Sequence, residues 1–333
     1  MNDAASSSSS VVPFEQRYEM HDRLWHDGTH AGWCALDRLL GREVIVNMPY
    51  RPADADRLLE LARMRARFRH VHFVPIYDVG ETKEGMPFFT EPYISAEDLG
   101  RLLRDRAADA ADDTLFRLVG YLLDTCKAVA FLHANGLLHH ELYPGNVLVT
   151  DPFGEVFVIR GHPSQFPANT AREEASEKME GRVIGVGNYT TPENLDPERF
   201  GVPDMSTDVY GLGGILFEIL YGIPPNGRNR FDSMQEFYAA VLRRNGPPER
   251  GTLCAAAARW PGVAEKLAGV CLRALEFDRA KRQASVTALV TEIEASLMGC
   301  AGEAPARPAP SRARKLIDFL SLGYFSKDKA QAS

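Results

Sequence analysis

Apolar residues recur along this chain with two different periods, and the change from one to the other predicts two structural regions. Between residues 18 and 92, short apolar runs such as 43–48 and 73–79 alternate with turn residues, which is typical of strands. Within this region a basic segment, 53–69, carries apolar side chains at helical spacing, namely Leu58, Leu59, Ala62 and Phe68. We therefore expect a strand-rich region that is interrupted by one helix.

From residue 96 onward the apolar pattern is that of helices. Residues 115–135 and 208–221 are predominantly apolar and predict buried helices. Residues 263–275 and 284–297 are amphipathic and predict helices with one face on a core. A small strand-rich part followed by a larger helical part indicates an α+β arrangement.

The two ends of the chain differ in composition from this folded region. Residues 1–13 are Ser-rich and polar, and we predict that they are disordered. One domain is expected over residues 14–298, with its strand-rich part at 14–92 and its helical part at 93–298. A Pro/Ala linker then covers 299–311, and a tail that is both basic and apolar covers 312–333.

Composition narrows the classes of function. The 333 residues are 45% hydrophobic and 25% charged with a net charge of −7, which favours a globular protein without general attraction to nucleic acid. The chain has no run of the roughly 18 apolar residues that a transmembrane helix needs, and its start is unlike a secretory signal. Its five cysteines are scattered without a Cys-x-x-Cys pair, so we expect a reducing, cytoplasmic location.

Five motifs then follow one another in a familiar order. They read RMRARFRHVHFVPIYDVG (63–80), HANGLLHHELYPGNVLV (133–149), GNYTTPE (187–193), TDVYGLG (207–213) and DRAKR (278–282). They resemble the run after the regulatory helix, the catalytic loop, the end of the activation segment, the start of the central helix and the late Asp-Pro-x-x-Arg of protein kinases. The resemblance is to the bacterial serine/threonine kinases and covers about residues 18–298. It implies a two-lobed protein-kinase-like fold with a strand-rich N-lobe and a larger helical C-lobe.

Against this family the residues that would hold ATP have changed. Trp25, Asp27 and His30 stand where the glycine-rich loop has its three glycines, and Gly28 lies between the last two of these positions. Glycines let backbone amides approach the phosphates, whereas an indole would crowd them and a carboxylate would repel them.

The next two strands carry further departures. The lysine that holds the phosphates is Asn47, and the alanine above adenine is Ile45, whose extra carbons would fill that space. The hinge-like run 87–94, which ends at Ile94, places Glu91 at the usually apolar gatekeeper position. An unpaired buried carboxylate there would be costly.

The catalytic positions of the family have changed as well. Leu61 replaces the helix glutamate that pairs with the lysine, Glu141 replaces the catalytic aspartate, and Tyr143 replaces the lysine that steadies the γ-phosphate. Asn146, a metal ligand in the family, is retained. Arg160 aligns with the metal-binding aspartate, and a guanidinium cannot bind Mg²⁺ because it offers only donors and stays charged.

The positions that support the fold are kept. Glu193 and Arg282 match the ion pair that ties the activation segment to the helical lobe, and Asp208 matches the buried aspartate that braces the catalytic loop. We also expect Arg160 to point into the former metal site and to pair with Glu91 or Glu141.

The resemblance therefore favours a pseudokinase, which is a catalytically impaired kinase domain that acts as a regulatory or scaffolding module for other proteins. No cofactor is expected. The alternative is an active serine/threonine kinase that uses ATP, Mg²⁺ and non-standard residues, and a third reading is a sensor of a small ligand. The tail segment 315–325 is apolar between basic residues, and it either docks weakly on a partner or membrane surface or packs on its own domain.

Overall fold

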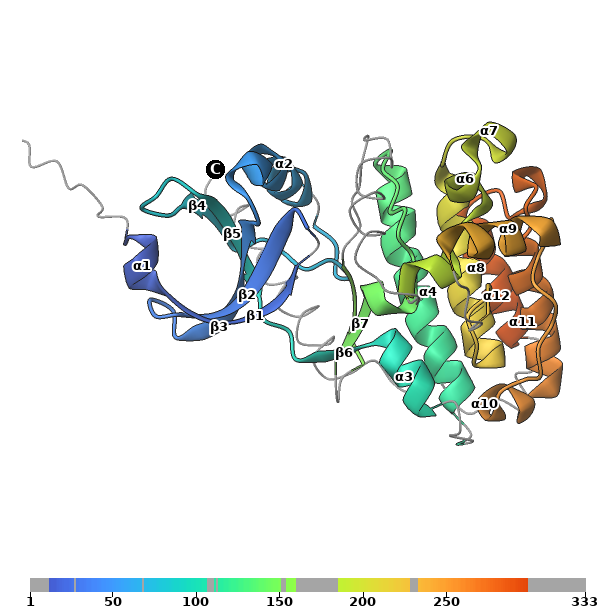
Figure 1. Cartoon of the computed structure of the whole chain (residues 1–333). Coiled ribbons are helices and arrows are strands. Elements are labelled where there is room, and N and C mark those ends of the chain that lie inside the picture. The colour runs from blue at the N-terminus through green and yellow to red at the C-terminus, as the bar shows by residue number, and fades with distance from the viewer. Residues whose placement is uncertain are drawn as a thin grey trace, which may run out of the picture. The chain divides into compact units, whose positions relative to one another are not determined.

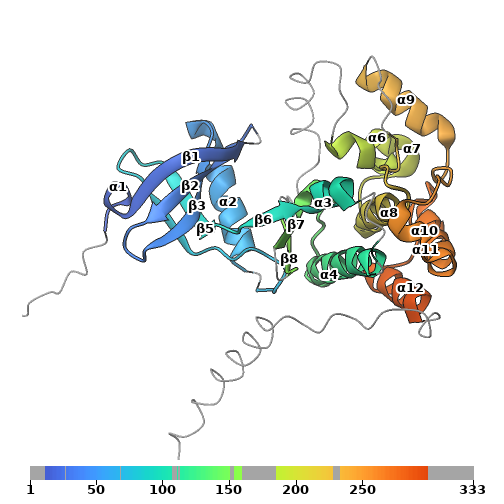
Figure 2. The same ribbon diagram turned by 90° about the horizontal axis from the view of Figure 1, so that it is seen from below.

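The computed structural model describes residues 12–26, 28–67, 69–106, 111, 113–150, 154–159, 185–227 and 233–298. These residues form two compact units, one ending at Ile94 and one beginning at Ser95. Figures 1 and 2 show the first as a curved sheet with a helix against it and the second as a group of helices. The first unit is strand-rich and antiparallel and the second is helical, so the predicted α+β arrangement is present.

The first unit, the small lobe, is built on five antiparallel strands in the order β1-β2-β3-β5-β4. The strands are β1 (Tyr18–His26), β2 (His30–Asp37), β3 (Arg42–Pro49), β4 (Asp78–Glu81) and β5 (Pro87–Pro92). Its helices are α1 (Phe14–Arg17), the 3₁₀ turn η1 (Pro52–Asp54) and α2 (Ala55–Arg65). The helix expected within 53–69 is therefore present and shorter than predicted.

The two faces of this sheet carry different side chains, because successive residues of a strand point to opposite sides. Val44 and Val46 pack with Tyr18, Ala35 and Phe88 on one face. On the other face Phe89 of β5 packs against Leu58 and Ala62 of α2. Helix α2 therefore lies on the face that also carries Ile45 and Asn47.

The second unit, the helical lobe, surrounds one long buried helix, α8 (Met205–Tyr221). The longest helices around it are α4 (Thr114–Ala134), α11 (Pro261–Ala274) and α12 (Val286–Met298). Its shorter helices are α3 (Leu99–Arg106), α6 (Pro192–Leu195), α7 (Pro197–Phe200), α9 (Met234–Arg244) and α10 (Ala255–Ala258), with 3₁₀ turns η2 (Pro144–Asn146), η3 (Gly185–Tyr189) and η4 (Arg279–Lys281). A three-stranded sheet consists of β6 (Ala96–Asp98), β7 (Val147–Thr150) and β8 (Val156–Val158).

Sequence signals explain both the burial of α8 and the positions of its two ends. Its glycines allow close approach, since a Cβ on Gly211 would lie 2.7 Å from Leu142 and one on Gly213 would lie 2.7 Å from Ala274. The helix begins with a capping box between Asp204 and Thr207, which satisfies the first backbone donors. It ends at Gly222 in the left-handed conformation, φ 70°, which favours glycine.

The predicted helices occur close to their expected bounds, but the strand predicted at 73–79 is wrong over most of its length. The strand starts only at Asp78, and residues 74–77 have no regular structure. Pro75 lies in this stretch and has no backbone N–H to give to a ladder. Among the residues that the structure describes, none of the helices combines the length and apolar composition that a bilayer crossing requires.

Candidate functional site

The first candidate site is the face of the small-lobe sheet that carries α2, where the family places ATP. Trp25 of β1 pairs with Gly32 of β2, and Gly32 pairs with Asn47 of β3, so these three residues share one face. The indole lies directly on Gly32, because a Cβ built there would meet the Trp25 ring at 2.5 Å. The space above the middle of β2 is therefore occupied by an aromatic ring of the protein.

Asn47, at the lysine position, is fully buried on this face. Neither its amide nitrogen nor its amide oxygen has a hydrogen-bond partner within the described part of the chain. A buried polar group left without a partner costs about 1–3 kcal/mol. Asn47 carries no charge that could attract a phosphate, and its position in the strand leaves it below the protein surface.

The other positions of this site are placed as follows. His30 is buried, and its ring meets that of Trp25 edge-on with centroids 4.9 Å apart. Gly28, in the hairpin turn, has φ 91°. Ile45 lies opposite Glu91 and is half-buried, as is Ile94 beyond the end of β5. Asp27 lies outside the described residues.

Glu91, at the gatekeeper position, is 7% exposed and forms an ion pair with Arg65 of helix α2. Arg65 Nη2 lies 2.6 Å from Glu91 Oε2 and also donates to the carbonyl of Val74 at 3.1 Å. The guanidinium stands 5.4 Å from the centre of the Phe89 ring. The buried carboxylate thus has a partner within its own lobe, so its charge is balanced without Arg160, which lies outside the described residues.

Sequence reasoning did not find Arg65. The signal was available, because Arg65 follows Leu61 by one helical turn and therefore shares the inward face of α2. Leu61 itself packs against the cluster of Leu58, Ala62 and Phe89, whereas Glu60 is exposed. The inward face of α2 thus presents leucine and arginine where the family presents glutamate.

The second candidate site is the catalytic loop of the helical lobe, which is organised by Asp208 of α8. Its two carboxylate oxygens accept the backbone N–H groups of His139 and His140, both at 2.8 Å. His133 Nε2 lies 2.7 Å from Oδ2 of the same carboxylate. Burial alone would raise the pKa of Asp208, but the hydrogen bond from His133 and the neighbouring groups outweigh it, and the pKa is lowered.

The two loop histidines differ in their surroundings. His139 is 1% exposed, and burial lowers its pKa to about 4 even though the Asp208 charge opposes this shift. The imidazole of His139 is thus neutral at physiological pH. His140 adopts φ 66°, which is uncommon outside glycine, and its backbone N–H is held by Asp208. One carboxylate therefore fixes both the position of the loop and its least favourable backbone angle.

The reactive end of the catalytic loop carries Glu141, Tyr143 and Asn146. Asn146 is 1% exposed, and its Nδ2 donates to the Glu141 carbonyl at 2.8 Å, while its Oδ1 has no partner among the described residues. The Tyr143 ring folds over Gly145, where an added Cβ would meet it at 2.5 Å, and lies 6.1 Å from the ring of Tyr189. An aromatic ring thus lies where the family has a lysine.

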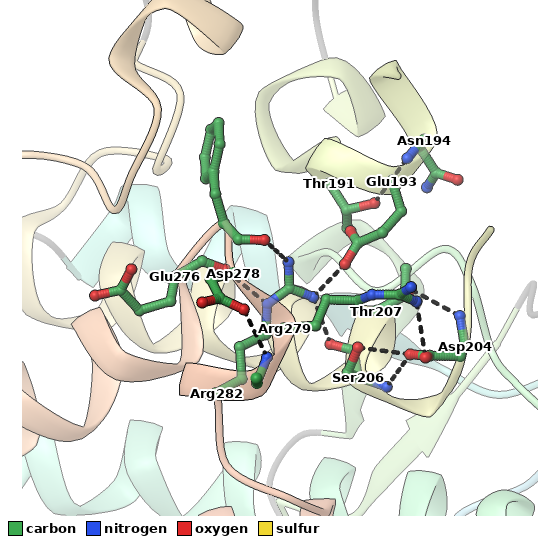
Figure 3. Close-up of polar contacts among 12 residues, drawn as sticks. Thr191, Glu193, Asn194, Asp204, Ser206, Thr207, Glu276, Asp278, Arg279 and Arg282 are labelled. Atoms are coloured by element: carbon green, nitrogen blue, oxygen red, sulfur yellow. Dashed lines mark hydrogen bonds and ion pairs between the residues drawn. The ribbon is translucent and has the colours of Figure 1, made fainter. Parts of the chain in front are cut away.

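The third feature is the buried ion pair that links α6 to the turn before α12, drawn in Figure 3. Arg282 Nη1 lies 2.6 Å from Glu193 Oε1, and neither side chain has any exposed surface. The guanidinium also donates to three backbone carbonyls, those of Glu276 at 2.7 Å, Ser206 at 2.9 Å and Phe277 at 3.5 Å. It thereby connects α6, the start of α8 and the turn before α12.

Comparisons with known proteins confirm the predicted kinase fold. Residues 50–292 match the family model described as the protein kinase domain. The chain is 32% identical over 216 residues to the DNA damage-responsive serine/threonine-protein kinase RqkA of Deinococcus radiodurans, covering 63% of this chain and 30% of RqkA. It is 27% identical over 321 residues to the serine/threonine-protein kinase PknD of Protochlamydia amoebophila, covering 88% of this chain and 31% of PknD.

A solved structure with the same fold is the PknI kinase domain of Mycobacterium tuberculosis. It superimposes with a TM-score of 0.56 at 18% identity, over 87% of this chain and 99% of that domain. The chain spans about a third of the length of the curated relatives that it matches.

Proposed function

This chain belongs to the protein kinase family, and we propose that within the family it is a catalytically impaired member that serves as a regulatory or scaffolding module for other proteins. The observation that carries the proposal is the Trp25 indole resting on Gly32, on the sheet face that also bears Asn47. Binding of ATP there would require the indole to leave and a cation to be present.

Two groups that would act on the phosphates are missing from the small lobe. Asn47 brings no positive charge, and the inward face of α2 offers Leu61 in place of a carboxylate. Removal of one preorganised electrostatic group costs about 10²–10³ in rate. Because these groups act as a unit, their losses do not simply add, but together they remove both members of the family's lysine–glutamate pair from this lobe.

The catalytic loop supports the same proposal. Tyr143 covers Gly145 with an apolar ring, and Glu141 is one methylene longer than the family's aspartate, where a shift of about 1 Å can cost roughly a hundredfold in rate. By contrast, the contacts of Asp208 with the loop and of Glu193 with Arg282 keep the shape of the lobe. A domain with a stable shape and few phosphate-binding groups is suited to protein binding.

A second candidate, an active serine/threonine kinase that uses ATP and Mg²⁺, is favoured by one observation. The Oδ1 of Asn146 has no hydrogen-bond partner in the described part of the chain, while its Nδ2 is fixed by the loop, and an amide oxygen is a suitable ligand for Mg²⁺. The small-lobe residues do not fit the nucleotide, so we derive no catalytic step through it. The expected cytoplasmic location stays a prediction that rests on the cysteine pattern.

One experiment separates the candidates. Thermal unfolding of the full chain is followed with and without ATP and Mg²⁺, since a ligand of the native state raises the apparent stability. We expect no shift for the impaired module, and a shift of several degrees would contradict it.

In parallel with the thermal unfolding experiment, transfer of radiolabelled phosphate from ATP is measured for the full chain, with the Glu141→Gln variant as control. Transfer that disappears in Glu141→Gln would establish the active kinase, because a contaminating kinase would not respond to that change.

A further inference from the structure

The second half of helix α2 (Figure 1) and the segment after it carry a run of arginines without acidic residues. Residues 61–77 contain no aspartate or glutamate, whereas arginine stands at every second position from 63 to 69. On a helix, two residues span about 200° of rotation, so successive members of such a run point to opposite sides. The run therefore divides into an inward and an outward set.

Burial shows which arginines belong to each set. Arg65 is the inward member, since it is half-buried and pairs with the gatekeeper carboxylate. Arg63 and Arg67 are exposed and four residues apart, so they share the outward face. The chain stays coiled as far as Arg67, because Ala66 has helical angles (φ −64°, ψ −19°) and the Arg67 N–H donates to the Met64 carbonyl at 3.1 Å.

The outward arginines have no carboxylate of their own. Arg63, Arg67 and Arg69 are all exposed, and none forms an ion pair with another residue that the structure describes. We call these three residues the α2 arginine cluster. The helix dipole favours basic residues in the last turn of a helix, but Arg69 lies three residues beyond the C-cap, where this effect has faded.

The charge around the cluster is counted over α2, the segment to residue 77 and the neighbouring η1, β3 and β5. Opposite charges cancel among Arg42, Glu43, Arg51, Asp54, Arg65 and Glu91, of which the last four form two ion pairs. The others are Asp56, Arg57 and Glu60 in the first half of α2 and the three arginines of the cluster. Four arginines against two carboxylates give a net charge of +2, in a chain whose net charge is −7.

This charge is also unevenly placed. Both uncancelled carboxylates lie in the first half of α2, with Glu60 one turn before Arg63, whereas the cluster occupies the last turn and the residues after it. Val71 follows the cluster and is 64% exposed. A concentrated positive charge thus lies beside an exposed apolar side chain.

We propose that the α2 arginine cluster binds a phosphomonoester, namely that of a phosphorylated serine or threonine in a partner protein, with Val71 against a neighbouring apolar side chain. Such a group carries a charge of about −1.5 to −2 at pH 7 and three acceptor oxygens. This charge matches the local excess of arginine. The proposal rests on the proposed function as a binding module and supplies the class of partner for it.

The geometry of the cluster favours a phosphate over a carboxylate. Side chains four residues apart on a helix have Cβ atoms about 5–6 Å apart, so Arg63 and Arg67 can reach one group together. A carboxylate uses both of its oxygens in a single bidentate contact with one guanidinium, whereas a phosphomonoester has a third oxygen for a second guanidinium.

The test uses the full chain and a fluorescently labelled peptide in which one central phosphoserine and an adjacent leucine are set among alanine and glycine. Binding is followed by fluorescence anisotropy at low salt and again at about 0.5 M salt, where exposed charges are screened. Matched peptides carry serine or glutamate in place of phosphoserine. We expect the phosphoserine peptide to bind about tenfold more tightly than the glutamate peptide, the serine peptide not to bind, and salt to weaken the binding.

Variants locate the site. Arg63→Gln and Arg67→Gln should each weaken binding by about tenfold, because each removes one charged contact. Arg57→Gln is the matched control, since it makes the same change of charge at an exposed position in the first half of the same helix. Glu60→Gln should strengthen binding, because it removes the carboxylate one turn before Arg63. Thermal midpoints check that all four variants are folded.

Four outcomes would overturn the proposal. Equal binding of the serine peptide would show that the phosphate is irrelevant, and an equal loss in Arg57→Gln would show attraction to the whole helix. Displacement by inorganic phosphate at the same concentration as unlabelled phosphopeptide would indicate a site for the bare anion. Binding to phosphatidylserine vesicles without binding of the peptide would assign the cluster to a membrane surface.

This experiment is independent of the proposed function in its readout. Failure of peptide binding would leave the thermal test with ATP unaffected. A thermal shift with ATP would contradict the impaired module and would leave the measured affinity for the phosphopeptide unchanged.

Discussion

The buried pair of Glu193 and Arg282 gives the sharpest prediction about stability. In Glu193→Ala the guanidinium keeps its three carbonyl acceptors but loses the one carboxylate that pairs with it among the described residues. Removal of one partner from a fully buried pair costs about 3–5 kcal/mol because it strands a charge. Since domains of this kind are stable by only about 5–15 kcal/mol, we expect a large loss in the helical lobe.

The assay must report on the helical lobe alone. The chain has three tryptophans, of which Trp25 and Trp33 lie in the small lobe and Trp260 lies in the helical lobe, packed on Phe116. In a Trp25→Phe, Trp33→Phe background the fluorescence of Trp260 follows urea unfolding of that lobe. A loss of about 3 kcal/mol should lower the urea midpoint by about 1 M or more.

A matched control is the exposed pair of Arg250 and Glu265 on the same lobe. Glu265→Ala removes one partner from a solvated pair, where the expected cost is about 0–1 kcal/mol. If Glu193→Ala lowers the midpoint no more than Glu265→Ala does, the buried pair carries no special energy and the reasoning fails.

Two further predictions concern the small lobe and acid stability. Glu91→Leu should destabilise the small lobe by roughly 1–3 kcal/mol, because it leaves Arg65 without its carboxylate. A second substitution in the same chain, Arg65→Met, should recover most of the lost stability. Hydrogen exchange of the α2 amides measures both effects, and unchanged protection in Glu91→Leu would refute the role of the pair. His139 has a pKa lowered to about 4, so the neutral form is favoured by folding. Its contribution is complete above the unfolded pKa of about 6.5 and is lost as the pH falls toward 4, by at most about 1.4 kcal/mol per pH unit. The urea midpoint, followed by Trp260 fluorescence, should therefore depend less on pH between 6.5 and 4 in His139→Leu than in the unmodified chain. An equal pH dependence in both proteins would contradict this role of His139.

Much of the fold could be predicted because its signals are local. The apolar stretch at 208–221 indicated α8, and the short apolar run at 43–48 indicated the strand that became β3. The prediction of a strand over 73–79 was wrong for a local reason as well. The apolar pattern continues across Pro75, but proline has no backbone N–H to donate, and the strand begins only at Asp78.

The contacts of the site were harder to predict, because they depend on how distant segments meet. The pair of Arg65 and Glu91 joins residues 26 apart in sequence. The spacing from Leu61 places Arg65 on the inward face of α2, but its contact with Glu91 depends on how the helix lies on β5. The same holds for Trp25, whose position implied crowding of phosphates but whose contact with Gly32 requires the register of the β1–β2 hairpin.

The contact between Trp25 and Gly32 also links the effects of substitutions at these two positions. A valine introduced at position 32 would collide with the indole, and loss of the indole alone would leave a glycine with nothing to pack on in the middle of a strand. The two positions are therefore coupled, so the cost of a substitution at one depends on which residue occupies the other.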